Sequence, residues 1–175
     1  MWVFTYKFDL DGFLYKYKAR LCVRGDLQHS IHYDNIVATL VAKVFQALIA
    51  IIAAFGLYAL QLDAVNAFTN SIIDETVYCE CPEGFTQSGQ CLLLLRALYG
   101  LRRSPLLWLK EFSKTLLQLG LHQIPGEACL FTNGHVIVFF YVDDIVLLGQ
   151  DLPALHRFKD QLLQQYEMRD LGELS

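Results

Sequence analysis

The chain has 175 residues, of which 54% are hydrophobic and 18% are charged, and its formal net charge is −4. This length suffices for one domain with a substantial core, and the composition excludes a disordered chain. The acidic total excludes a uniformly basic protein that coats nucleic acid. Five of the 14 basic residues lie within residues 1–25 and five more within residues 96–114, so local cationic surfaces are compatible with the acidic total.

Apolar and polar side chains alternate in residues 3–8 and 13–23, around Asp11 and Gly12, which predicts a β-hairpin. Four cations stand at even-numbered positions in or directly after its second strand: Lys16, Lys18, Arg20 and Arg24. A side-chain period of two places them on a single face. Like charges in a row destabilise a strand unless they are solvated or face an anion. A solvated face and a face directed at a polyphosphate therefore both stay open.

Residues 36–60 are apolar and predict one long helix or two stacked helices, ending near Gly56. Residues 44–60 carry no charge, but they are at the short limit for a transmembrane helix and include Gln46. A buried core helix is therefore favoured over a membrane span, and no membrane partner is expected. Residues 2–8 are mixed in character and precede acidic residues, which argues against a signal peptide and against secretion.

The five cysteines form no paired C-x-x-C units. A zinc site made from Cys79, Cys81 and Cys91 would lack a histidine at finger spacing, so reduced intracellular thiols are favoured. His29 and His32 form a weak metal-binding pattern, for which a polar loop is the simpler interpretation.

Residues 60–68 predict a strand in which Asp63 shares one face with Gln61 and Val65. The opposite face is apolar and consists of Leu60, Leu62 and Ala64. A carboxylate in such a buried-looking strand is unusual, because an unpaired buried charge is costly. Asp63 is therefore a candidate functional residue.

Residues 136–149 form a very apolar run that Asp143 and Asp144 interrupt. The β-branched and aromatic residues on both sides predict two strands joined by a two-residue turn, which the aspartate pair would form. Asp-Asp is a poor sequence for a tight turn, since such turns favour Asn-Gly or Asp-Gly. Adjacent carboxylates repel each other and a divalent cation relieves the repulsion, so a metal site and a solvated loop tip are the two interpretations.

Two amphipathic helices and a third hairpin complete the pattern. Ser104 as N-cap opens a helix over residues 104–120, whose apolar face is Leu109, Phe112, Leu116 and Leu119. Asn133 and Gly134 predict the turn of a hairpin. Asp151 caps the other helix, whose inward residues are Leu155, Phe158, Leu162 and Tyr166.

Short strands are expected at residues 77–81 and 91–95, and no further element is expected in residues 168–174. From residue 61 onward the main order is strand, helix, strand, strand, helix, which predicts an α+β fold with an antiparallel sheet and helices on one face. The strand that carries Asp63 can then lie beside the aspartate hairpin. Three carboxylates gathered in this way suit two Mg²⁺ ions about 3.5–4 Å apart, an arrangement that catalyses phosphoryl displacement.

Sequence blocks at residues 17–25, 61–68, 75–85, 98–105, 141–144 and 168–174 stand in a diagnostic order and spacing. With them the chain resembles a copia-type reverse transcriptase of an LTR retrotransposon, the RNA-directed DNA polymerase domain of a Gag-Pol-like polyprotein. A lone Asp-Asp pair would be a weak signal, whereas the ordered set of blocks is specific.

The resemblance implies that Asp63, Asp143 and Asp144 are catalytic carboxylates that hold two Mg²⁺ ions, with Mn²⁺ as a possible substitute. One ion would activate the primer 3′-hydroxyl, and the other would bind the triphosphate and stabilise the leaving pyrophosphate. Phe68 falls where the family places the side chain that excludes a ribose 2′-hydroxyl, which implies DNA synthesis. A core aromatic is the alternative interpretation of Phe68.

The resemblance also implies substrate contacts. Lys18 and Arg20 would reach the triphosphate. The sugar and triphosphate pocket would be lined by Ala64, Val65, Asn66 and Ala67, with their backbone N–H groups facing phosphate. The templating strand and the incoming base would contact Tyr99, Gly100, Arg102, Arg103 and Ser104. The arginines would bind backbone phosphate without reading sequence.

The implied fold is the fingers and palm of a right-hand polymerase, with an antiparallel palm sheet backed by helices. The fingers-like parts would be residues 1–36 and 71–103, and the palm-like parts residues 37–70 and 104–175. The segment before Asp63 departs from the family, because it lacks an acidic, proline-containing stretch and an arginine-bearing helix, which suggests repacking or decay. Since the sequence begins inside the fingers and stops at Ser175, the thumb and ribonuclease H domain are expected to be missing.

The leading hypothesis is the core of an RNA-directed DNA polymerase that extends a primer from deoxynucleoside triphosphates on an RNA or DNA template. The alternative is a degenerate retrotransposon product that keeps the fold, binds nucleic acid at most weakly and catalyses nothing. In an intact element, the other polyprotein domains, including integrase and ribonuclease H, would be partners. The expected location is intracellular, in a cytoplasmic particle or the nucleus.

Overall fold

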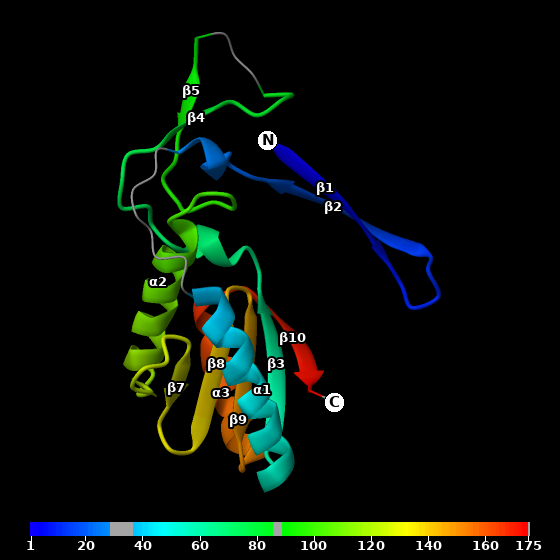
Figure 1. Ribbon diagram of the computed structural model, residues 1–175, viewed down its shortest axis with the longest axis vertical. Coiled ribbons are helices and arrows are strands. Elements are labelled where there is room, and N and C mark those ends of the chain that lie inside the picture. Colours follow the sequence, from blue (N-terminus) through cyan, green and yellow to red (C-terminus); the bar gives the residue numbers. More distant parts are fainter. Residues whose placement is uncertain (29–36, 86–88, 175) are drawn as a thin grey trace.

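The centre of the molecule is a six-stranded antiparallel sheet with the strand order β10-β3-β9-β8-β7-β6. The computed structural model describes residues 1–28, 37–85 and 89–174 (Figure 1), so His29 and His32 lie outside the described residues. The strands of the sheet are β3 (Tyr58–Ala64), β6 (His122–Gln123), β7 (Leu130–Thr132), β8 (Val136–Tyr141), β9 (Asp144–Gly149) and β10 (Met168–Glu173). The predicted α+β class with an antiparallel sheet is confirmed.

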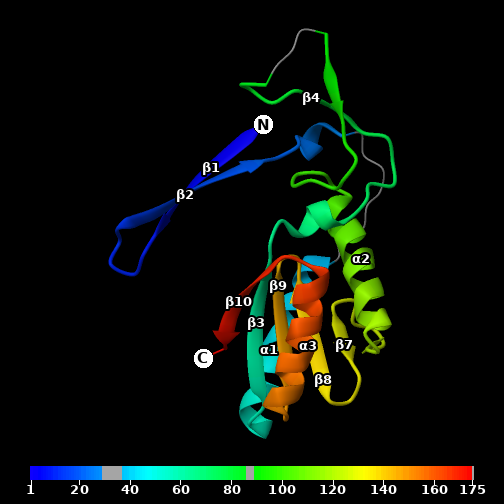
Figure 2. The ribbon, with the colours of Figure 1, turned by 180° about the vertical axis from the view of Figure 1, so that it is seen from behind.

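Helices cover both faces of this sheet: α1 (Val37–Phe55) lies on one face, and α2 (Ser104–Gln118) and α3 (Leu152–Gln165) lie on the other (Figures 1 and 2). Consecutive residues of a strand point to opposite faces. The ring of Phe139 is 5.7 Å from that of Phe45 in α1, and the ring of Phe140 is 4.8 Å from that of Phe112 in α2. The prediction of helices on one face only is wrong, because β8 and β9 are apolar on both faces.

The helix α1 is only partly a core helix. Leu48 is buried, and Val44 and Ile52 pack partly against the core, but Phe45 and Phe55 are exposed to solvent. The prediction of a buried helix is therefore wrong for the side of α1 that faces away from the sheet. Among the described residues, no helix is long and apolar enough to cross a membrane.

The other helices follow the predicted patterns with one shift. In α3 the predicted inward residues Leu155, Phe158 and Leu162 are buried. Ser104 is the first residue of α2 rather than its N-cap, and its hydroxyl donates instead to the carbonyl of Leu98 at 2.7 Å. The buried face of α2 is accordingly centred on Leu107, Trp108, Phe112, Thr115 and Leu116, whereas Leu109 and Leu119 are only partly buried.

The strand β10 was not expected from the sequence. It pairs with β3 along the edge of the sheet, and its residues are mostly exposed. The ammonium of Lys159 in α3 pairs with the carboxylate of Asp170, which fastens the strand to the neighbouring helix. A polar edge strand shows no apolar alternation, so the pairing partner rather than the local sequence determines its structure.

Two smaller antiparallel ribbons lie beyond one end of the sheet (Figure 1). The predicted hairpin is present as β1 (Trp2–Phe8) and β2 (Leu14–Leu21), and the short strands are β4 (Tyr78–Glu80) and β5 (Cys91–Leu93). Arg24 does not continue the cationic row of β2, because it lies beyond the strand and forms an ion pair with Asp26. Lys7 joins the row instead, opposite Lys16.

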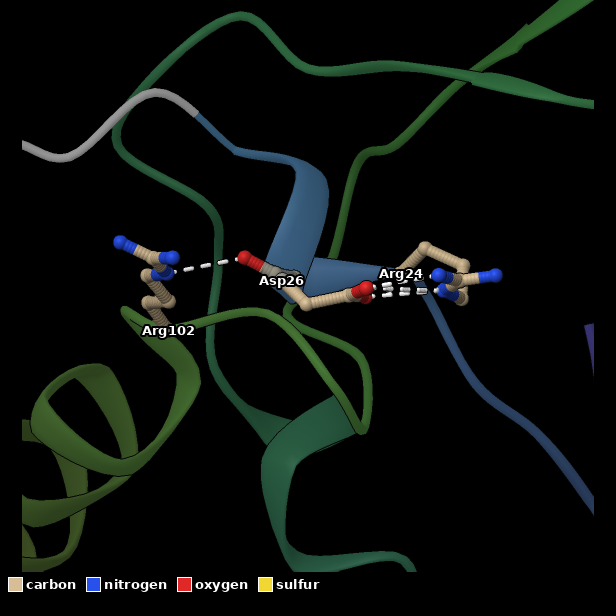
Figure 3. A network of polar contacts seen from close by, with 4 residues as sticks. Arg24, Asp26 and Arg102 are labelled. Carbon is tan, nitrogen blue, oxygen red and sulfur yellow. Dashed lines mark hydrogen bonds and ion pairs between the residues drawn. The ribbon is translucent and has the colours of Figure 1, made fainter.

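After β2 the backbone passes very close to the backbone of the segment before α2. This contact involves Gly25 and Gly100 and is called the Gly25–Gly100 crossing. The N–H of Val23 donates to the carbonyl of Tyr99 at 2.8 Å, and a Cβ on Gly100 would lie 2.0 Å from the Val23 oxygen. A Cβ on Gly25 would lie 1.9 Å from the Gly100 oxygen. Arg102 reaches the backbone of the turn that carries the Arg24–Asp26 pair (Figure 3), with Nε 2.8 Å from the Gly25 oxygen. Only glycine permits this approach of the two backbones.

We expect Gly100→Ala to destabilise the protein by roughly 2–4 kcal/mol, because the new methyl group meets backbone atoms and the φ of +92° is unfavourable for alanine. Gly120→Ala is the matched control, since its φ is +85° and nothing lies within 4 Å of the added Cβ. The control should lose only about 1–2 kcal/mol. Urea unfolding of both variants measures the difference, and equal losses would show that the crossing is not tight.

Candidate active site

Strand register brings the three candidate carboxylates to one end of the sheet. Asp63 is the direct cross-strand partner of Asp144, which begins β9. Asp143 precedes it in the turn, and the Asp143 carbonyl accepts the N–H of Ala64 at 2.7 Å. The predicted adjacency of the strand and the aspartate hairpin is confirmed. The catalytic roles of the three residues stay predictions.

The turn of this hairpin is one residue earlier than the sequence suggested. Tyr141 pairs with Asp144, so the two central residues are Val142 and Asp143 rather than the two aspartates. Asp144 belongs to the ladder because it also pairs with Asp63. Val142 has a φ of +56°, which is strained for a β-branched residue. The indole Nε1 of Trp108 donates to the Val142 carbonyl at 2.6 Å.

The carboxylates interact electrostatically. Desolvation raises the pKa of Asp144, and the negative charges of Asp143 and Asp63 raise it further. Arg169 of β10 is the cross-strand partner of Asp63 on its other side, and its Nη1 lies 3.7 Å from the Asp63 carboxylate. The sequence pattern indicates no role for Arg169, because it does not predict the strand that carries this residue.

The donor chemistry of this cluster fits a divalent cation, since carboxylate oxygens are the ligands that Mg²⁺ prefers. In the described part of the chain, no three His, Cys, Asp or Glu side chains are already arranged as a metal-ligand group. Binding of a cation would therefore require the carboxylates of Asp63, Asp143 and Asp144 to reorient toward it. All five cysteines are free, in agreement with the prediction of reduced thiols.

The cationic face of β2 is directed toward this end of the sheet. The guanidinium carbon of Arg20 lies 5.0 Å from the ring centre of Tyr99, and the Tyr99 ring is 4.6 Å from that of Phe68. Partial burial lowers the pKa of Lys18, as do the charges of Arg20 and Lys7, while Asp143 and Asp63 act in the opposite sense. Lys18 thus lies within electrostatic range of the carboxylates. This arrangement favours the interpretation that the row faces an anion over that of a purely solvated face.

Phe68 is both a packed aromatic and a neighbour of the cluster. It lies in the short 3₁₀ helix η2 (Ala67–Asn70) directly after β3, and its side chain is 6% exposed. The chain turns into η2 through Asn66, whose φ of +51° is tolerated by asparagine better than by most residues. The two interpretations of Phe68 are therefore compatible with each other.

Two of the four backbone N–H groups assigned to phosphate have partners within the protein in this structure. The N–H groups of Ala64 and Val65 already donate to the carbonyls of Asp143 and Glu167, at 2.7 and 2.9 Å. A phosphate oxygen would have to break the sheet pairing to accept from them. Phosphate contact by the backbone of residues 64–67 stays a prediction, and for Ala64 and Val65 it would require a change of partner.

The residues assigned to the template have protein partners in this structure. Tyr99 and Gly100 form the crossing with β2, and Nε of Arg102 donates to Gly25. Arg103 forms two hydrogen bonds to the Asp74 carboxylate, which hold the pKa of Asp74 below its usual value. Ser104 is buried, and its hydroxyl donates a hydrogen bond to the Leu98 carbonyl. Template contact by these side chains stays a prediction, and Arg102 and Arg103 would have to exchange partners to make it.

Residues 1–175 match the family model described as reverse transcriptase (RNA-dependent DNA polymerase). The chain belongs to this family. It is 31% identical to the retrovirus-related Pol polyprotein from transposon TNT 1-94 of Nicotiana tabacum, over 98% of this chain and 14% of that protein. The identity is 32% to the polyprotein from transposon RE1 of Arabidopsis thaliana, over 99% of this chain and 12% of that protein.

A third relative is the transposon Ty1-MR1 Gag-Pol polyprotein of Saccharomyces cerevisiae, with 30% identity over 98% of this chain and 10% of that protein. The reverse transcriptase chain thus spans between 10 and 14% of the length of these relatives. The resemblance to copia-type reverse transcriptases is confirmed. No solved structure shows significant similarity to the chain.

In this reverse transcriptase chain, the directions of the pKa shifts predict opposite effects of pH on folding stability for two aspartates, Asp144 and Asp170. Because the pKa of Asp144 is raised above 3.8 in the folded state, the folded protein loses stability as pH rises through that range. Asp144→Asn should therefore be more stable than the wild type near neutral pH, and this gain should vanish below the unfolded pKa.

Asp170→Asn is the matched control, because the hydrogen bond from Lys159 lowers the pKa of Asp170 below 3.8. This carboxylate contributes stability above its unfolded pKa that is lost as pH falls through the folded value. Asp170→Asn should therefore be less stable near neutral pH. Urea unfolding across a pH series measures both variants, and the same sign for both would contradict the electrostatic description.

Proposed function

We propose that this chain is the catalytic core of an RNA-directed DNA polymerase, which transfers deoxynucleotides to a primer 3′-hydroxyl as directed by an RNA or DNA template. The observation that carries the proposal is the meeting of Asp63, Asp143 and Asp144 at one sheet end, opposite the cationic strand β2. Family membership supports the same reaction class. The length of the relatives supports other polyprotein domains, such as integrase and ribonuclease H, as partners.

In the proposed arrangement the three carboxylates would hold two Mg²⁺ ions, with Mn²⁺ as a possible substitute. The bound ions would supply a lowered pKa of the primer hydroxyl and charge stabilisation at the leaving pyrophosphate. The primer oxygen would attack the α-phosphorus while the bond between this phosphorus and the oxygen that bridges it to the β-phosphate breaks. Pyrophosphate would leave, and the hydroxyl proton would pass to solvent. Lys18 and Arg20 would lie against the triphosphate, whose negative charge suits their partly buried positions.

The proposed division of the chain follows the ribbons and the sheet. Fingers-like parts would be residues 1–36 and 71–103, and palm-like parts residues 37–70 and 104–175. The Gly25–Gly100 crossing supports this division, because it joins the two parts assigned to the fingers. We further propose an intracellular location, in a cytoplasmic particle or the nucleus, which agrees with five free cysteines.

Primer extension on poly(rA) with oligo(dT) and Mg²⁺ tests the proposal. We expect Asp143→Asn to lose about 10³-fold in activity, because a metal ligand would be removed. Asp151→Asn, the same chemical change at the N-cap of α3, should retain activity. Both variants are compared in the chain alone and in a fusion to the following region of a relative's polyprotein.

Equal incorporation by wild type and Asp143→Asn would contradict the catalytic assignment. Activity only in the fusion would show that the chain needs the following region. Inactivity of the wild type in both forms would favour the alternative of a degenerate product.

Phe68→Ala should raise ribonucleotide incorporation relative to deoxyribonucleotide by roughly tenfold or more, because a bulky side chain beside the sugar would be removed. The ratio of kcat/KM values for the two nucleotides measures this effect. Phe112→Leu is a control for altered core packing, since Phe112 is fully buried beneath the sheet. An unchanged ratio in Phe68→Ala would leave Phe68 with its packing role alone.

A further inference from the structure

Val142 is held in a conformation that its side chain disfavours. It is the first central residue of the turn between β8 and β9, and its φ is +56°. Of the described residues, only Val142 and Asn66 combine a positive φ with a side chain beyond glycine. A β-branched residue rarely adopts this region, so neighbouring contacts must stabilise the turn.

Hydrogen bonds to two consecutive carbonyls fix the turn. The indole Nε1 of Trp108 donates to the Val142 carbonyl at 2.6 Å, and the Ala64 N–H donates to the Asp143 carbonyl at 2.7 Å. The orientation of each peptide plane around Asp143 is thereby set from outside the turn. The first donor comes from α2 and the second from β3, so the turn is held from two separate elements.

The indole itself is rigidly placed. Trp108 is 1% exposed, and its ring lies 5.1 Å from that of Phe112 and 5.4 Å from that of Tyr166. The Tyr166 hydroxyl is hydrogen-bonded to the hydroxyl of Thr115, which lies further along α2, the helix that carries Trp108. Because these contacts leave the indole little freedom, its N–H acts as a fixed donor beneath the turn.

We propose that Trp108 is a positioning residue that holds the Val142–Asp143 turn so that the carboxylates of Asp143 and Asp144 can bind a divalent cation together with Asp63. The proposal rests on the proposed function and extends it to a residue that touches neither substrate nor cation. Its physical basis is the indole hydrogen bond, which stabilises the strained backbone of Val142. Outer residues that orient metal ligands typically change metal affinity by 10- to 100-fold.

Trp108→Phe is the first test, because it removes the indole N–H and keeps an aromatic ring packed against Phe112 and Tyr166. We expect Mn²⁺ affinity, measured by calorimetry, to fall about tenfold, and kcat of primer extension to fall similarly with little change in the nucleotide KM. Trp2→Phe is the matched control. It removes the other indole donor, which binds the Glu83 carbonyl in the ribbon region, and should leave Mn²⁺ affinity unchanged.

Val142→Gly provides the decisive comparison, since glycine adopts a positive φ without strain. If the indole bond stabilises the strained turn, the loss of Mn²⁺ affinity on Trp108→Phe should be several-fold smaller in the Val142→Gly background. Equal losses in the two backgrounds would overturn the proposal. So would full Mn²⁺ affinity in a folded Trp108→Phe protein.

Two further measurements separate positioning from packing. Tyr166→Phe removes the hydrogen bond between the hydroxyls of Tyr166 and Thr115 but keeps the indole hydrogen bond, so it should lower stability without lowering Mn²⁺ affinity.

If Trp108→Phe does not fold, benzothienylalanine at position 108 replaces the N–H by sulfur at nearly constant volume, and unchanged Mn²⁺ affinity would overturn the proposal. Because Mn²⁺ titration needs no turnover, a wild type that binds Mn²⁺ but extends no primer, either alone or in the fusion, would refute the proposed function and leave this inference standing.

Discussion

The register between β3 and β9 is the constraint on which the site depends. A shift of one residue would move the side chain of Asp63 to the opposite face and pair a different residue with Asp144. The buried side chains of β3, Leu60, Leu62 and Ala64, prevent that shift, because it would expose them to water. Burial of the apolar face thus specifies the position of the carboxylates. Desolvation and the charges of Asp143 and Asp63 oppose the arrangement, and both raise the pKa of Asp144.

The second part of the site is positioned by backbone contact rather than by side-chain burial. The ribbon of β1 and β2 has mostly exposed side chains, and a two-stranded ribbon is marginally stable alone. Its attachment at the Gly25–Gly100 crossing, with the Arg102 hydrogen bond, fixes where the ribbon leaves the body of the molecule. The Arg20–Tyr99–Phe68 stack then continues from this crossing to the end of β3. Two glycines therefore determine how far the cations lie from the carboxylates.

Sequence reasoning predicted the elements whose local pattern is strong. The hairpin of β1 and β2, the strand of Asp63, and α2 and α3 have clear periodicity or turn residues, and Asn133-Gly134 joins β7 and β8 as expected. The strand β10 was missed because its polar sequence has no apolar alternation, and Arg169 was missed with it. The pattern places the turn one residue late because the apolar runs on both sides end at the aspartate pair, whereas strand pairing and the Trp108 hydrogen bond determine the structure. Such information is tertiary and is absent from any short stretch of sequence.

These misses share a cause that bears on function. Arg169 and Trp108 act on the carboxylates from outside the sequence blocks that carry them, and the strained Val142 inside one block depends on the Trp108 hydrogen bond from outside it. Arg169 balances the charge of Asp63 at 3.7 Å, and the indole opposes relaxation of the turn. A site of like charges on a strained turn is unstable by itself, so the surrounding fold must stabilise it. The blocks at residues 61–68 and 141–144 therefore supply the carboxylates, while contacts from β10 and α2 stabilise their meeting at the site.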